Sequence, residues 1–61
     1  MVLKELKRGE FFKFTAKGKM YVYEGYNPVS KRCCFHNFND TSVKHIGKPE
    51  RKVFLVQIIK L

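Results

Sequence analysis

Two cysteines and two histidines are the residues of this chain best suited to metal binding or nucleophilic chemistry. They are Cys33, Cys34, His36 and His45. Structural zinc takes four nitrogen or sulfur ligands, commonly from Cys-x-x-Cys and His-x₃₋₅-His pairs. The chain has neither spacing, and adjacent residues such as Cys33 and Cys34 point to opposite faces of a strand. We therefore expect no metal site and no cofactor.

Cys34 and His36 are the one pair suited to act as nucleophile and base. Residues two apart on a strand can touch, but a catalytic thiol also needs an orienting group and an oxyanion site. The sequence has no Gly-rich phosphate loop and no Ser-His-Asp arrangement, and its five acidic residues are scattered. We therefore expect no catalytic residues and no enzymatic activity.

The cysteines and the N-terminal residues also bear on the compartment. A disulfide between neighbouring cysteines closes a strained ring, so two free thiols in a reducing cytoplasm are expected. Residues 1–10 carry charges too closely spaced for a signal peptide. No stretch approaches the roughly 20 apolar residues of a membrane span. The sequence therefore predicts a soluble cytoplasmic protein without a membrane partner.

Charge is the strongest feature of the composition. Thirteen Lys and Arg stand against five Asp and Glu, which makes the formal net charge +8. Such an excess favours polyanionic partners, with nucleic acid first and acidic proteins or anionic lipids next. Lysines also keep small proteins soluble, so the charge by itself does not define a site.

Period-two alternation of apolar and polar residues predicts strands along most of the chain. The predicted strands are 10–16, 20–26, 31–38 and 51–61, with 43–46 as either a short strand or one helical turn. Turn-forming residues separate them at 17–18, 27–30, 39–42 and 47–50. The predicted fold is a single all-β domain over 1–61, either a small five-stranded barrel or a curled antiparallel meander, with 1–8 as a lead-in.

The segment from Leu6 to Phe12, Leu-Lys-Arg-Gly-Glu-Phe-Phe, resembles the opening of SH3-like and OB-like domains. In those domains a leucine, a short basic turn, a glycine with an acid and a hydrophobic strand commonly begin the first long strand. The resemblance implies a barrel and assigns no site. In length, charge and this opening, the chain also resembles small proteins of bacteria and their phages, which implies no activity.

The alternation also predicts which side chains form the core. One face of each strand is assigned to the interior, and Leu6 closes one end. The predicted core residues are Leu6, Phe12, Phe14, Met20, Val22, Cys33, Phe35, Val53 and Leu55.

Basic and aromatic residues alternate on the faces left over, and they are the candidate nucleic-acid site. In small barrels that bind single strands, exposed aromatics stack on bases while cations follow the phosphates. The candidate residues are Lys13, Lys19, Tyr21, Tyr23, Lys31 and Arg32. The tyrosines can equally belong to the core, with wet hydroxyls at its edge.

The last predicted strand is apolar on both faces, which suggests an alternative function. Its second face carries Phe54, Val56 and Ile58. An apolar face of this kind is expected to be central or covered by a partner. The alternative is a non-catalytic structural or protein-interaction module, either a homodimer or a subunit of a larger bacterial or phage assembly.

Overall fold

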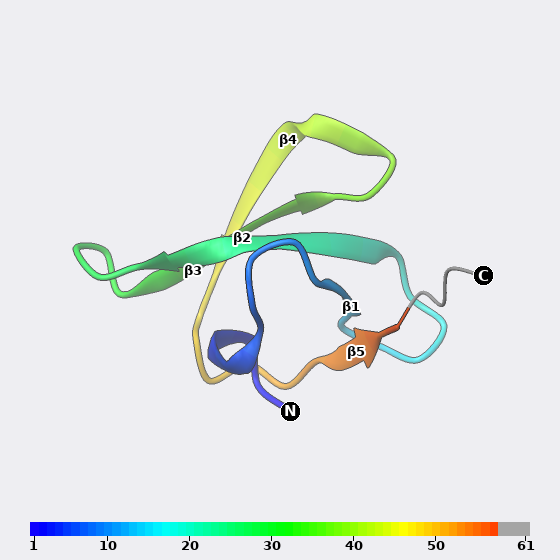
Figure 1. Cartoon of the computed structure of the whole chain (residues 1–61), viewed down its shortest axis with the longest axis horizontal. Helices are drawn as coiled ribbons and strands as arrows, with labels where there is room; N and C mark the ends of the chain where they lie inside the picture. Colours follow the sequence, from blue (N-terminus) through cyan, green and yellow to red (C-terminus); the bar gives the residue numbers. More distant parts are fainter. Residues whose placement is uncertain (58–61) are drawn as a thin grey trace.

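Five antiparallel strands form one sheet in the order β4-β3-β2-β1-β5 (Figure 1). The computed structural model describes residues 1–57. The strands are β1 (Phe11–Lys13), β2 (Met20–Asn27), β3 (Arg32–Asn37), β4 (Asp40–Gly47) and β5 (Phe54–Val56), and one 3₁₀ turn, η1 (Leu3–Glu5), precedes them. The all-β, five-stranded antiparallel prediction is confirmed, and residues 43–46 belong to a strand.

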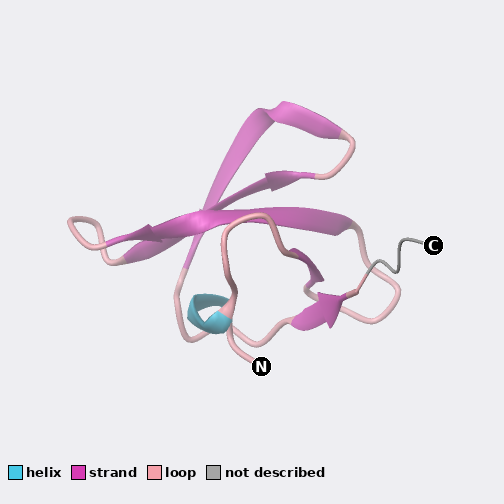
Figure 2. Ribbon diagram, viewed as in Figure 1, coloured by secondary structure: helices cyan, strands magenta, loops and turns pink. Residues whose placement is uncertain are grey.

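The sheet is open, which corrects the predicted barrel and curled meander. Its edges are β4 and β5, and within residues 1–57 no ladder joins them. Figure 2 shows the two edge strands on opposite sides of β2. Barrel closure requires strands long enough to tilt and stagger around an axis. Here β1 and β5 have three residues each, which is too short to carry the sheet round.

Two predicted strands are shorter in the structure than in the alternation pattern. The turn after β1 already begins at Thr15, whose carbonyl accepts a hydrogen bond from the Gly18 amide at 3.1 Å. Of residues 51–57, the described part of the last predicted strand, Phe54–Val56 form β5. Before it, Val53 donates its amide to the Met1 carbonyl at 2.9 Å. The N-terminal segment therefore takes hydrogen bonds that strand neighbours would otherwise make.

Leu6 closes one end of the core, as predicted, and Leu3, which the prediction did not include, is buried beside it. Leu3 and Leu6 are 0% and 5% exposed. The Leu3 amide donates to the Arg51 carbonyl at 2.8 Å, and the Lys4 amide donates to the Pro49 carbonyl at 2.9 Å. These bonds hold η1 against the segment that leads into β5, so the two buried leucines are fixed over the core.

The core lies on one face of the sheet and is mainly aromatic. Phe12, at 0% exposure, stacks with Tyr21 at 5.7 Å between centroids and packs edge-on against Phe35 at 5.3 Å. The buried residues are Leu3, Leu6, Phe12, Tyr23, Cys33, Phe35 and Val53, with Phe14, Tyr21 and Leu55 partly buried against them. The core assignments of Leu6, Phe12, Cys33, Phe35 and Val53 are therefore confirmed, and Phe14 and Leu55 lie at the core edge.

The core assignment of β2 was wrong by one residue. Phe12 faces Tyr21 in the β1–β2 register, and Tyr23 faces Phe35 in the β2–β3 register. Cross-strand partners share a face, so the tyrosines point to the core. Met20 and Val22 alternate with them and lie half-buried on the other face. We call that other side of the sheet the outer face.

Candidate nucleic-acid interface

The two candidate tyrosines do not form an exposed stacking surface. Tyr23 is 3% exposed, and its hydroxyl donates to the Cys33 sulfur at 3.4 Å inside the core. Tyr21 lies between Phe14 and Phe35, with centroids 5.3 and 5.4 Å away. Tyr23 is therefore a core side chain that cannot stack on a base, which corrects its predicted role, whereas the predicted role of the half-buried Tyr21 stays a prediction.

A bulge in β2 places a third tyrosine differently. The β2–β3 register shifts between Tyr23 and Gly25, and Gly25 has φ +147°. One extra residue in a strand changes the side of the sheet on which later side chains lie. As a result Tyr23 and Tyr26, three positions apart, share the core side, and Tyr26 lies beyond the core at 46% exposure.

The four candidate cations are split between distant parts of the sheet. Lys13 pairs with Met20 in the β1–β2 register, next to Lys19. Arg32, beside Lys31, pairs with Asn27 at the far end of β2. β2 has eight residues from Met20 to Asn27, so these ends are about 23 Å apart at the rise of a strand. The structure therefore brings Lys13 close to Lys19 and Lys31 close to Arg32, but it does not unite the two pairs.

A basic groove lies beside the second pair. It has a volume of about 580 Å³ and is lined by Arg32, Ile46, Gly47, Lys48, Glu50 and Arg51. The Arg51 guanidinium carbon lies 4.1 Å from the centre of the Phe14 ring, a cation–π distance that holds this arginine in place. Three cations against one carboxylate make the groove a candidate phosphate site. Of these cations the sequence pattern predicted only Arg32, because Lys48 and Arg51 are placed beside it by the turn at 47–50.

The carboxylates of the described chain leave most cations unneutralised. Glu5 and Glu10 accept hydrogen bonds from the Val2 and Lys7 amides at 2.7 and 2.6 Å, and Asp40 accepts from Ser42. Among residues 1–57, one Lys or Arg forms an ion pair with a carboxylate: Lys44 Nζ lies 3.8 Å from Glu24 Oε1. The other cations of residues 1–57 have no carboxylate of that range within ion-pair distance.

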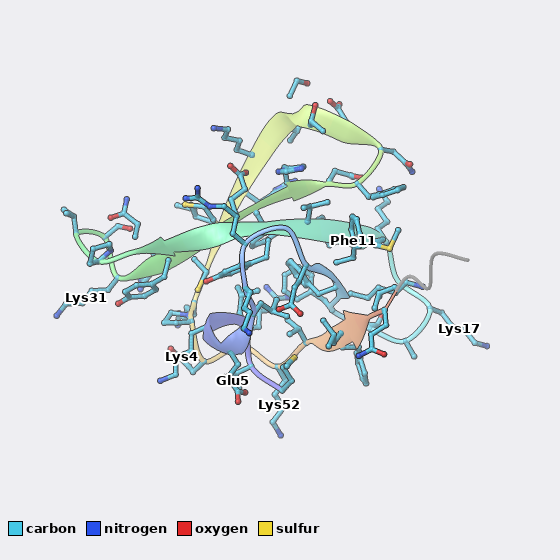
Figure 3. All side chains as sticks on the ribbon, viewed as in Figure 1. Lys4, Glu5, Phe11, Lys17, Lys31 and Lys52 are labelled. Carbon is cyan, nitrogen blue, oxygen red and sulfur yellow. The ribbon has the colours of Figure 1, made fainter. Side chains whose placement is uncertain are left out.

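These cations point in several directions. Figure 3 shows Lys17 and Lys31 at opposite ends of the long axis, with Lys4 and Lys52 near η1. The molecule measures 38 Å along that axis, several times the screening length of about 8 Å at physiological salt. Distant lysines therefore act on a polyanion separately, and the groove is a local concentration within a broadly positive surface.

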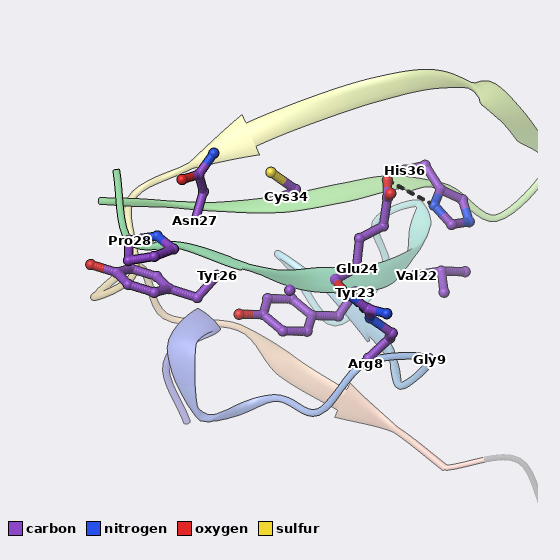
Figure 4. Close-up of a pocket in the computed structure, with 11 residues that line it drawn as sticks. Arg8, Gly9, Val22, Tyr23, Glu24, Tyr26, Asn27, Pro28, Cys34 and His36 are labelled. Atoms are coloured by element: carbon purple, nitrogen blue, oxygen red, sulfur yellow. Dashed lines mark hydrogen bonds and ion pairs between the residues drawn. The ribbon is translucent and has the colours of Figure 1, made fainter. Parts of the chain in front are cut away.

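Glu24, at the bulge, contacts three polar side chains: His36, Lys44 and Arg8. Its carboxylate lies 3.1 Å from His36 Nδ1, and the two side chains are 28% and 19% exposed. Arg8 Nε donates to the Glu24 carbonyl at 2.9 Å. Figure 4 shows these residues around a cleft of about 650 Å³ that also includes Cys34. Both oxygens of the Glu24 carboxylate therefore already have a partner, His36 for one and Lys44 for the other.

The cysteines and histidines are divided between the two faces. Cys33 is buried and Cys34 half-buried, both as free thiols. His45 stacks on Phe35 at 5.5 Å on the core side, whereas His36 lies on the outer face with Glu24. Within residues 1–57, no three His, Cys, Asp or Glu side chains are grouped so as to hold a metal ion.

The outer face carries aromatic residues that the tyrosine hypothesis missed. Phe11 packs edge-on against Phe38, with centroids 5.4 Å apart. Phe38 is 42% and Phe54 is 55% exposed. Phe54 and Val56 lie on this second face, as the last strand's pattern suggested, since they pair with Lys13 and Phe11. Ile58 lies outside the described residues. If Tyr21 and Tyr23 had been assigned to the core, the alternation would have predicted this outer face from the sequence.

Comparisons of the chain with family models, with curated proteins and with solved structures found no match. Residues 1–57 contain no helix whose length and apolar character would let it cross a membrane.

Proposed function

We propose that this protein binds nucleic acid through phosphate contacts. The observation that carries the proposal is the uncompensated positive charge. The formal net charge is +8, and within residues 1–57 the cations other than Lys44 have no carboxylate partner. Cations left free in this way are available to displace the counterions that surround a nucleic acid, and that displacement drives association.

The groove of Arg32, Lys48 and Arg51 is the proposed phosphate site. Arginine offers several donors in a fixed plane and binds phosphate oxygens in pairs. Arg51 is already oriented by the Phe14 ring, so it loses less side-chain freedom on binding. Arg32 and Lys48 come from β3 and from the turn after β4, so the site depends on the folded chain.

The test is binding measured by fluorescence anisotropy, with a labelled oligo(dT) and a labelled duplex. We expect binding to both at low salt, and a linear fall of log K with log salt between about 50 and 200 mM. The slope reports how many phosphates are neutralised. Absence of binding to both nucleic acids at low salt, or affinity that does not change with salt, would refute the proposal.

A second candidate is the protein-interaction module, because one observation favours it. Phe54 is 55% exposed and adjoins further apolar side chains on the outer face. A contiguous apolar patch on a small protein commonly marks a contact with another molecule. This candidate predicts salt-resistant self-association or protein binding, whereas the first predicts salt-sensitive binding of nucleic acid.

A further inference from the structure

Two exposed aromatic side chains and one cation form a row across the outer face. Phe54 pairs with Lys13, and Lys13 pairs with Met20. The Phe38 amide donates to the Met20 carbonyl at 3.0 Å, which continues the row to the next strand position. Across three strand spacings, Phe38 and Phe54 are about 14 Å apart, with the Lys13 and Met20 side chains between them.

The second row of the same face is apolar and supports the first. Val56 pairs with Phe11, and Phe11 pairs with Val22. The edge-on packing of Phe38 against Phe11, at 5.4 Å, holds one of the exposed rings upright on the sheet. The Phe38 ring is therefore held by Phe11, whereas Phe54 lies at the exposed end of the row.

Charge decides which occupant this face suits. A second copy would approach with the same +8, and a two-fold interface brings identical patches together. Both copies of Lys13 would then be enclosed within one apolar contact. Glu24 cannot offset them, because His36 and Lys44 already occupy its carboxylate at 3.1 and 3.8 Å. An anionic occupant with flat apolar groups complements both the charge and the rings.

We propose that the outer face is a base-stacking platform for single-stranded nucleic acid, with Phe38 and Phe54 stacking on two non-adjacent bases and Lys13 contacting a phosphate of the backbone between them. This inference rests on the proposed function, for which it supplies the strand preference. Only unpaired bases offer their faces to an aromatic ring. Single strands therefore use both the platform and the charge, whereas duplexes use the charge alone.

The test compares the Phe38→Ala, Phe54→Ala double variant with the parent on oligo(dT) and on duplex. Stacking losses of about five- to 150-fold per base predict that oligo(dT) binding falls at least tenfold, while duplex binding stays within about twofold. Tyr26→Ala is the matched control, since Tyr26 is 46% exposed but lies on the core side. It should leave both affinities unchanged.

A second variant measures stacking directly by fluorescence and keeps an aromatic ring at position 54. The chain has no tryptophan, so Phe54→Trp introduces a single indole on the platform. Its emission should be quenched when oligo(dT) binds, because a stacked base approaches the ring. Tyr26→Trp should show no comparable quenching. Melting curves of each variant confirm that the sheet is retained.

Three outcomes separate this inference from the proposed function. If the parent binds neither nucleic acid, the proposed function itself fails. If the parent binds both and the phenylalanine variant weakens both equally or neither, the platform is refuted while phosphate binding stands. If sedimentation shows a parent dimer that Phe54→Ala dissociates, the face belongs to a second copy and the platform is refuted.

Discussion

The Tyr23 hydroxyl donates a hydrogen bond to the Cys33 sulfur, 3.4 Å away in the core. Burial of the ring, and then this hydrogen bond, raise the pKa of Tyr23 well above its usual 10.0. Both effects favour the protonated phenol, because a phenolate would be desolvated and would lose the donated bond. Tyr23, which was predicted to stack on bases, is thus a core side chain, and the fold is more stable when its phenol is protonated.

This relationship predicts alkaline destabilisation. A pKa raised in the folded state means that the folded chain holds its proton longer than the unfolded chain. The contribution to stability is complete below pH 10 and is lost as the pH rises toward the folded pKa, by up to about 1.4 kcal/mol per pH unit. Urea unfolding between about pH 8 and 11 should show this loss in the parent. In Tyr23→Phe it should be smaller, and a parallel loss in both would contradict the buried phenol.

Truncation of Phe12 should remove a large part of the stability. Phe12 is 0% exposed and packs with Phe14, Tyr21 and Phe35. Phe12→Ala is expected to cost about 3–5 kcal/mol in the free energy of unfolding, against a total of roughly 5–15 kcal/mol for a typical domain. Val29→Ala is the control, because Val29 is 92% exposed. Equal urea midpoints for the two variants would contradict the described core.

Loss of the groove cations should weaken nucleic-acid binding more than loss of the same charge elsewhere. Arg32→Ala with Lys48→Ala removes two positive charges from the groove. Each lost phosphate contact lowers the salt slope by about 0.7 to 0.9, so oligo(dT) and duplex should both bind more weakly. The matched control is Lys7→Ala with Lys17→Ala, both at exposed positions. Identical effects of the two double variants would show that overall charge acts without the groove.

The first residues of β4 give a prediction about acid titration. Asp40 Oδ1 accepts the Ser42 hydroxyl at 2.6 Å and the Ser42 amide at 3.1 Å. These bonds, the hydroxyl first, lower the pKa of Asp40 from 3.8. The stabilisation is present above 3.8 and is lost as the pH falls through the lowered pKa. Ser42→Ala should return the pKa toward 3.8 in a carboxyl-detected NMR titration, whereas Thr41→Ala should leave it low.

The sequence by itself determined the strand content and most of the core. Alternation in 10–16, 20–26 and 31–38 correctly indicated antiparallel strands, because a strand between core and solvent repeats every two residues. Phe12, Phe35 and Val53 were assigned to the interior on that basis, and they are buried. The excess of cations was also visible in the composition, since it depends on counting alone.

Tertiary structure decided the phase of β2, the openness of the sheet and the composition of each face. In β2 both phases are apolar, so only pairing with Phe12 and Phe35 places Tyr21 and Tyr23 inside. The Glu24 bulge arises from the register between two strands and has no periodic signal. Long-range contacts likewise bring Lys48 to Arg32 and Phe54 to Lys13. Local patterns record which residues alternate, but neighbours distant in the sequence determine which side they face.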